Sequence, residues 1–175
     1  CIVGVNFWKV TSSAGSSSGK VASPPWKLFR SNLSHPEHSD VGLILLDNPI
    51  KLDNYPTVAS AKAKDNTKGV RFRREAETAK EVIQTNTLIS SGESAGFKLE
   101  YLAKPEANEW LDTGGAVLNS KGEIVGVVSG KGQASGMLHI ARVDNYNGWT
   151  KSAISCSTAA GTRTWGGGGG GGGGG

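Results

Sequence analysis

Residues 112–130 have the sequence DTGGAVLNSKGEIVGVVSG and carry the clearest structural signal in the chain. The pair Gly114-Gly115 allows the backbone to take a positive φ or to approach a ligand closely. Two short runs of apolar, mostly β-branched residues follow, separated by the polar turn Asn119-Ser-Lys-Gly122. The stretch therefore predicts a tight glycine turn that leads into a β-hairpin. At that turn, Asp112 and Thr113 would present a carboxylate and a hydroxyl to a cleft.

A second informative stretch lies at residues 33–50, LSHPEHSDVGLILLDNPI. It starts as a polar turn that contains a proline and continues as an apolar run, which stops at Pro49. Asp40 therefore lies where the turn would deliver its carboxylate to the mouth of a buried strand. On these residues alone, an aspartate in such a place is most often a turn or cap residue.

A third stretch, residues 144–154, predicts a terminal helix with Tyr146, Trp149 and Ile154 on one side. Taken alone, it indicates no more than a helix that caps the domain. Met137 to Val143, just before it, predicts the last strand of the chain.

Together these three stretches resemble trypsin- and chymotrypsin-like serine proteases. The first is similar to the family's Gly-Asp-Ser-Gly-Gly-Pro loop with its following hairpin and Val-Ser-Trp-Gly segment. The second resembles His-Pro-(variable)-Asp-Ile-Ala-Leu-Leu, and the third resembles the closing Arg-Val-(variable)-Asn-Tyr-(two residues)-Trp-Ile-Lys. The stretches occur in the family's order, and the resemblance covers about residues 30–155.

The resemblance implies an all-β fold with the two-barrel chymotrypsin-like architecture and a short C-terminal helix. In the family a His-Cys dipeptide precedes the catalytic Asp by about the distance from Cys1 to Asp40. Cys1 would then follow the catalytic His, and the first barrel would be incomplete, with an exposed sheet edge. The expected domain is 1–157, with a partial N-terminal barrel at about 1–58, a C-terminal barrel at about 59–143, a terminal helix at about 144–155 and a flexible glycine-rich tail at 158–175.

The resemblance also assigns a site. Asp40 matches the carboxylate that orients the His, and Thr113 stands at the position of the nucleophilic Ser. Its added methyl group would crowd the His or the substrate. Asp40 and Thr113 should face one cleft, with room for an imidazole between them. The further implied positions are the oxyanion and turn residues Leu111, Asp112 and Gly114, with Leu111 replacing a Gly, and the substrate-binding residues Ser129 and Gly130.

The chain has three histidines, His35, His38 and His139, and none stands where the family's base is found. His35 and His38 precede Asp40 in a loop and are expected to be solvent-exposed. A substitute base and a metal pair are the alternatives, although no third metal ligand is placed beside them. His139 is expected in a strand. The resemblance implies no cofactor and no metal.

The implied function is that of a serine endopeptidase domain, inactive or impaired in this chain because the His is missing and Thr replaces Ser. Its partner would be a polypeptide substrate, and it would be secreted, extracellular or periplasmic. The alternative is a non-catalytic protease homologue that binds a protein partner, which Thr113 and Leu111 favour. A third hypothesis is a lipidated surface protein anchored through Cys1.

Composition excludes several other classes. The net charge is +4, and its 19 Lys and Arg are mixed along the chain with 15 Asp and Glu, so we expect no nucleic-acid partner. The densest basic patch, residues 68–74, is interpreted as a solvated strand face, with an anionic-partner site as the alternative. No apolar run of about 18 residues is present, so no membrane span is expected. Cys1 and Cys156 do not form a disulfide framework, although they could pair.

The remaining segments give weaker expectations. Ile2 to Val10 alternates loosely and predicts a strand, and the serine- and glycine-rich residues 11–19 predict a loop. Residues 74–84 fit either a helix or strand and loop. The other expectations are strands at 26–29, 69–73, 85–90 and 97–102, the last two of which flank a turn at 91–96. In the strand at 69–73, Val70 and Phe72 alternate with Arg71 and Arg73. In the strand at 97–102, the apolar residues Phe97, Leu99 and Tyr101 alternate with Lys98 and Glu100.

Overall fold

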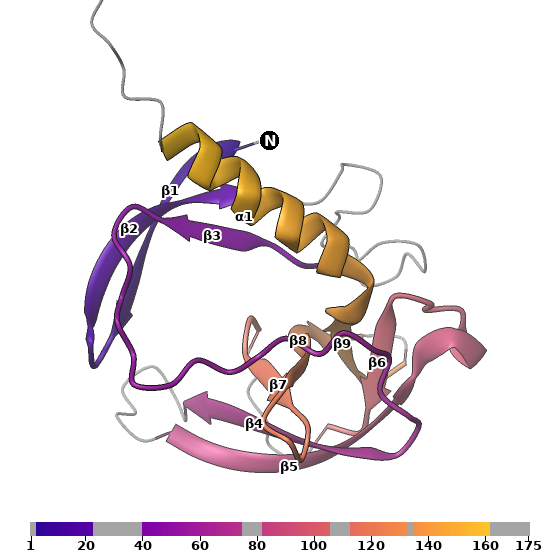
Figure 1. Cartoon of the computed structure of the whole chain (residues 1–175). Coiled ribbons are helices and arrows are strands. Elements are labelled where there is room, and N and C mark those ends of the chain that lie inside the picture. Colours follow the sequence, from indigo (N-terminus) through magenta and orange to yellow (C-terminus); the bar gives the residue numbers. More distant parts are fainter. Residues whose placement is uncertain (1–2, 23–39, 75–81, 106–112, 133–134, 162–175) are drawn as a thin grey trace, which may run out of the picture.

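The computed structural model describes residues 3–22, 40–74, 82–105, 113–132 and 135–161. These residues form two β units and a C-terminal helix (Figure 1). A three-stranded antiparallel sheet has the order β1-β2-β3, and a closed six-stranded barrel has the order β4-β5-β6-β9-β8-β7. This arrangement confirms the expected all-β class with an incomplete first barrel. The sheet strands are β1 (Val3–Ser12), β2 (Gly15–Ala22) and β3 (Leu43–Leu46); the barrel strands are β4 (Thr67–Arg74), β5 (Val82–Ser91), β6 (Glu100–Ala103), β7 (Ala116–Leu118), β8 (Ile124–Lys131) and β9 (Leu138–Arg142).

The expectation of a loop at 11–19 is wrong, because this segment forms the β1–β2 hairpin. From Phe7 opposite Lys20, the pairing runs without a break to Ser12 opposite Gly15. The Ser12 hydroxyl accepts a hydrogen bond from the Ala14 N–H at 3.1 Å and donates to the Gly15 carbonyl at 3.3 Å, which closes the turn. Backbone pairing needs no apolar side chain, so a serine-rich segment that lacks apolar alternation can still form a strand.

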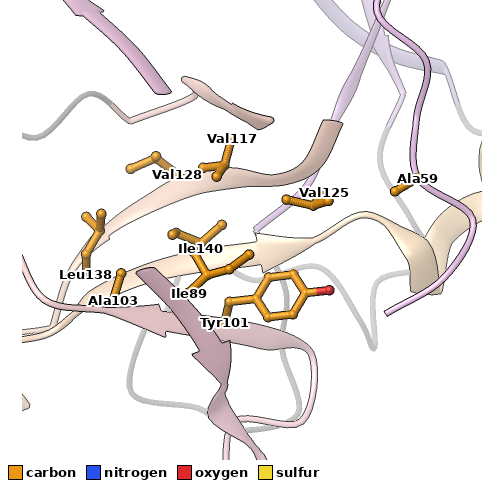
Figure 2. Close-up of a cluster of buried hydrophobic side chains, with 9 residues drawn as sticks. All are labelled: Ala59, Ile89, Tyr101, Ala103, Val117, Val125, Val128, Leu138 and Ile140. Atoms are coloured by element: carbon orange, nitrogen blue, oxygen red, sulfur yellow. The ribbon is translucent and has the colours of Figure 1, made fainter. Parts of the chain in front are cut away.

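The hydrophobic core lies inside the closed barrel (Figure 2). Burial of each large aliphatic side chain contributes about 1.5–3 kcal/mol to folding. Gly126 on β8 allows this packing, because a Cβ there would lie 2.5 Å from Ile140 Cγ2 and 2.9 Å from the Ala141 carbonyl oxygen. The core comprises Ala59, Ile89, Tyr101, Ala103, Val117, Val125, Val128, Leu138 and Ile140.

The structure overturns the interpretation of β4 as a strand with a solvated basic face. Arg71 is buried, whereas Phe72 is 45% exposed. β4 pairs with β5 and β7, and Arg71 lies opposite Thr85 and Val117, which are both buried. Because side chains alternate between the two faces of a strand, this register turns the arginine inward.

Strand β6 also differs from its expected pattern. It starts at Glu100, so Phe97 to Leu99 lie outside it, after the 3-10 helix η1 (Gly92–Ala95) that occupies the expected turn at 91–96. Glu100 was expected on the exposed face with Lys98 but is 2% exposed. A buried carboxylate requires a polar partner, and His139 on the neighbouring strand β9 provides it.

The terminal helix is present as a 3-10 turn η2 (Asp144–Tyr146) followed by α1 (Asn147–Gly161), which lies along β3 (Figure 1). Tyr146 and Trp149 meet edge to face, with ring centroids 6.3 Å apart. Ile154, expected on the same side, is 53% exposed. The helix continues through Gly161, so its last turn falls in the range where a tail is expected.

Two segments of the expected pattern fall partly or wholly outside the described residues. β4 ends at Arg74 and β5 begins at Val82, so the ends of 74–84 are strand rather than helix. The expected strand at 26–29 lies outside the described residues.

Candidate functional site

A side-chain hydrogen bond joins the described end of the segment that leads into β3 to the barrel. The Ser129 hydroxyl on β8 donates to Asp40 Oδ2 at 3.0 Å, across 89 residues of sequence. Asp40 is half-buried, and Val41 beside it packs with Ala141 and Tyr146. The packing of Val41 thus positions the carboxylate against β8, and the expected turn residue has a specific long-range partner.

The glycine turn at 114–115 is held against the same part of β8. The Gly114 N–H donates to the Val128 carbonyl at 2.8 Å, and the Val128 N–H donates to the Gly115 carbonyl at 2.9 Å. Gly114 has φ +90°, a conformation that side-chain-bearing residues rarely adopt. Thr113, the next residue back along the chain, is exposed. Two consecutive residues of β8 therefore link the groups: Val128 binds the turn that follows Thr113, and Ser129 binds Asp40.

These contacts refine the expected role of Gly114. Its N–H is engaged by Val128, so it serves the turn rather than supplying a free donor to an oxyanion. Gly130, the residue after Ser129, is buried on β8 opposite His139. Leu111 and Asp112 lie outside the described residues.

The arrangement provides a carboxylate and a hydroxyl, two of the groups that acyl transfer requires. The described residues include one histidine, His139, and its two ring nitrogens contact Glu100 and Ser135. His35, His38 and Cys1 lie outside the described residues. Within the described ranges, no three His, Cys, Asp or Glu side chains gather as metal ligands. No helix in the described part of the chain is long and apolar enough to cross a membrane.

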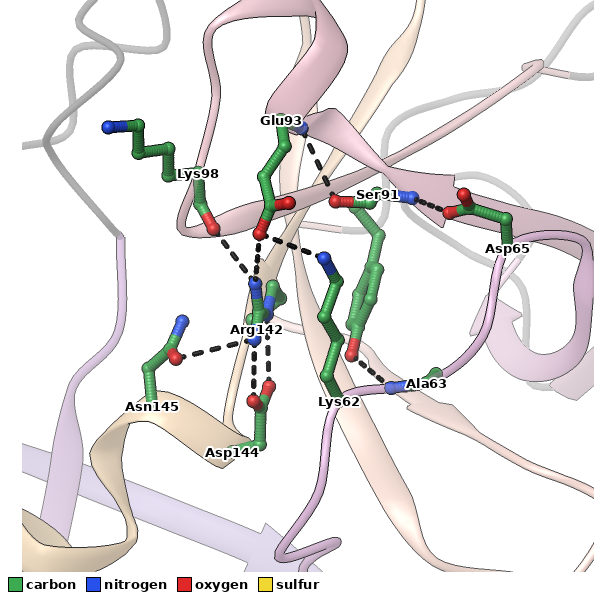
Figure 3. Close-up of polar contacts among 10 residues, drawn as sticks. Lys62, Ala63, Asp65, Ser91, Glu93, Lys98, Arg142, Asp144 and Asn145 are labelled. Atoms are coloured by element: carbon green, nitrogen blue, oxygen red, sulfur yellow. Dashed lines mark hydrogen bonds and ion pairs between the residues drawn. The ribbon is translucent and has the colours of Figure 1, made fainter.

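The sequence patterns missed a polar cluster centred on Arg142 at the end of β9 (Figure 3). Its guanidinium donates to both carboxylate oxygens of Asp144, at 3.1 and 2.7 Å, and to the Lys98 carbonyl at 2.9 Å. The hydrogen bond to Asp144 is the main cause that raises the pKa of Arg142. The hydrogen bonds of the Arg142 guanidinium join β9 to η2 and to the segment after η1. In the sequence, the only signal of this cluster is the short spacing between Arg142 and Asp144.

Two further groups near this cluster have shifted pKa values. The exposed Glu93 accepts from Lys62 at 2.8 Å, and this contact lowers the pKa of Glu93. Burial raises the pKa of Tyr101, whose hydroxyl accepts from the Ala63 N–H at 2.8 Å. These contacts fasten the loop before β4 to the barrel (Figure 3).

The sequence matches no protein-family model and no curated protein. Solved structures do share its fold. Kallikrein-related peptidase 10 superposes with a TM-score of 0.60 at 13% identity, over 81% of this chain and 75% of that one. Kallikrein-related peptidase 10 in complex with Zn2+ gives 0.54 at 16% identity, over 66% and 64%. The apo MamO protease domain from Magnetospirillum magneticum gives 0.48 at 13% identity, over 77% and 69%. With its closed barrel, second sheet and C-terminal helix, this chain has the fold of the chymotrypsin-like serine proteases.

Proposed function

We propose that this chain is a trypsin-like serine endopeptidase domain whose site is built from Asp40, Thr113 and Ser129, with a polypeptide as its substrate. The observation that carries the proposal is the hydrogen bond from Ser129 to Asp40, next to the turn that bears Thr113. It supports a role for Asp40 beyond that of a turn residue, because the carboxylate accepts a hydrogen bond from β8.

In the proposed chemistry, an imidazole between Asp40 and Thr113 takes the hydroxyl proton while Thr113 Oγ1 bonds to the carbonyl carbon of the peptide. Asp40 holds the resulting imidazolium, which then protonates the departing amine, and water releases the acyl group by the same route. Ser129 keeps the Asp40 carboxylate in position. The methyl group of Thr113 crowds this reaction, and no described histidine lies at this site, so the chain as given is expected to be impaired or inactive in hydrolysis.

The second candidate function is a non-catalytic protease homologue that binds a protein partner. The threonine at the exposed position 113 favours this function. A nucleophile needs freedom to rotate about χ1, which a β-branched side chain restricts. A binding surface needs only the hydrogen-bonding hydroxyl, which threonine still offers. Either function would place the protein outside the cytoplasm, as a secreted, extracellular or periplasmic protein. Neither function calls for a cofactor or a metal.

The test is labelling by a fluorophosphonate probe, with the modified residue located by peptide mapping. The variants are the natural chain and Thr113→Ser, each with and without added imidazole as an external base. Thr113→Ser should label at residue 113, faster with imidazole, and the natural chain far less. Asp40→Asn, added to Thr113→Ser, should slow labelling at residue 113 by about 10²-fold or more, since an imidazole that Asp40 does not orient is a poor base.

Ser129→Ala serves as the matched control, because it removes the contact to Asp40 and leaves the carboxylate in place. It should slow labelling at residue 113 less than Asp40→Asn does. If residue 113 remains unlabelled in every form, the hydrolytic proposal is wrong and the binding function is favoured. If Asp40→Asn labels as fast as its parent, Asp40 has no part in the site.

A further inference from the structure

A second chemical cluster lies in the barrel and shares no residue with the proposed protease site. His139 Nδ1 on β9 is 2.6 Å from Glu100 Oε2 on β6. Both side chains are almost fully buried, at 1% and 3% exposure. In the tautomer that donates Nδ1–H to the Glu100 carboxylate, the lone pair of the ring lies on Nε2.

The other ring nitrogen faces an exposed hydroxyl. His139 Nε2 is 3.1 Å from Ser135 Oγ, and the Met137 N–H donates to that same oxygen at 3.2 Å. Because Ser135 Oγ already accepts from Met137, its own proton is free to point at Nε2. The serine side chain is solvent-accessible, so a small molecule can reach it from outside while the base stays dry.

The surrounding turn is shaped to hold this contact. Gly132 lies so close that a Cβ there would be 2.5 Å from Ser135 Oγ and 2.6 Å from His139 Nε2. The turn is closed by hydrogen bonds from the Gly132 N–H to the Met137 carbonyl and from the Gly136 N–H to the Gly132 carbonyl. Phe97 meets the imidazole edge to face, with ring centroids 4.8 Å apart. The ring is therefore held on both nitrogens and by an aromatic neighbour.

We propose that Glu100, His139 and Ser135 form a second hydroxyl-activating relay that makes Ser135 a nucleophile toward small activated esters. Ser135 Oγ bonds to the carbonyl carbon while its proton moves to His139 Nε2, and Glu100 stabilises the imidazolium. The ester C–O bond breaks, and the leaving alcohol takes the proton from Nε2. Water then repeats the sequence on the acyl-serine and releases the carboxylic acid, so the net reaction is ester hydrolysis.

The relay goes beyond the proposed endopeptidase, because it uses none of the residues of that site. All three of its groups lie in the described chain, and it needs no external base. His139 lies opposite Gly130, the residue after Ser129, so the two sites approach each other across β8 and β9. Mapping the modified residue separates them, since one hypothesis requires an adduct on residue 113 and the other an adduct on residue 135.

The test is fluorophosphonate labelling of the natural chain without imidazole, followed by intact mass and peptide mapping. One adduct on Ser135 is expected. Ser120→Ala, a matched change at another exposed serine that belongs to neither site, should label at the same rate. Ser135→Ala should lose the adduct and should no longer release nitrophenol from p-nitrophenyl acetate. Because residue 135 is exposed, the variant should keep the fold.

His139→Gln and Glu100→Gln should each lower the labelling rate at Ser135 by about 10²-fold or more, with circular dichroism as the check on folding. Absence of an adduct on Ser135 in the folded natural chain overturns the proposal. An unchanged labelling rate in folded His139→Gln also overturns it, because the hydroxyl would then react without its base. If either buried variant fails to fold, mapping of the natural chain and Ser135→Ala decides.

Discussion

The closed barrel and the three-stranded sheet bury their side chains to very different extents. In the barrel, Ile89, Val117, Leu138 and Ile140 are completely shielded from solvent. In the sheet, Trp8 on β1 and Ile44 on β3 are 55% and 41% exposed. Apolar side chains that point into the barrel therefore contribute more to folding than Trp8 and Ile44 do on the sheet.

The difference in burial arises because the barrel is a closed sheet and the three-stranded sheet is open. Every barrel strand has two paired neighbours, so its inward side chains meet others from all sides. The sheet ends at β1 and β3, and α1 lies along one part of it (Figure 1). The hydrogen bond between Ser129 and Asp40 links the β3 side of the chain to the barrel. The stability of the domain should thus reside in the barrel, while the proposed protease site depends on both regions.

The largest expected effect tests this contrast with one chemical change at two places. Ile89→Ala removes a fully buried side chain from the barrel and should lower the free energy of unfolding by about 2–5 kcal/mol. Ile44→Ala, the matched change on β3, should lower it by less than about 1.5 kcal/mol, since that side chain is already partly hydrated. Urea denaturation measures both. Equal losses would contradict the contrast between the two regions.

The next effect concerns the Arg142 cluster, which holds the barrel to η2. Arg142→Ala leaves the carboxylate of Asp144, only 9% exposed, without its charged partner, and should cost about 3–5 kcal/mol. Lys62→Ala removes an exposed partner of Glu93 and should lower the free energy of unfolding far less than Arg142→Ala does. Adding Asp144→Asn to Arg142→Ala should recover part of the loss in urea denaturation. No recovery would mean that the ion pair is not the cause.

A smaller effect sharpens the link between the two regions. A double-mutant cycle on Ser129→Ala and Asp40→Asn should give a coupling energy of about 1–2 kcal/mol, the range for a hydrogen bond to a carboxylate reduced by partial exposure. Amide exchange in the single variants should speed up in β3 more than in β9. A coupling energy near zero would show that the two regions are joined by packing alone.

The smallest effect is a pH dependence on the barrel side. Lys62, and secondarily Arg142, lowers the pKa of Glu93 in the folded chain below its ordinary value of 4.5. The ion pair therefore stabilises fully above that ordinary value, and its contribution is lost as pH falls through the lowered pKa. Urea midpoints measured from neutral pH into this acidic range should fall less steeply in Glu93→Gln than in the natural chain. Lys62→Ala should flatten the curve similarly, and a slope unchanged in both variants would exclude this pair as its source.

Local sequence patterns predicted much of the fold. The glycine turn and hairpin at 112–130 and the strands that became β5 and β9 were predicted from apolar runs, because short-range alternation reflects a half-buried strand. The β1–β2 hairpin was missed, since serines and glycines carry no apolar signal. Arg71 and Glu100 were placed on the wrong face, because the barrel register and not residue type sets which alternate positions point inward.

The two chemical clusters also differ in whether local sequence patterns could predict them. Asp40, Thr113 and Ser129 were predicted as site residues from the order and spacing of short motifs, which can be recognised in the sequence because each motif is local. The relay of Glu100, His139 and Ser135 has no such signal, since Glu100 and His139 lie 39 residues apart and meet only because β6 pairs with β9. Turn chemistry and strand periodicity are properties of neighbouring residues, and can be recognised before folding. Burial of a charge, and the partner that makes it tolerable, follow from which distant strands become neighbours when the barrel closes.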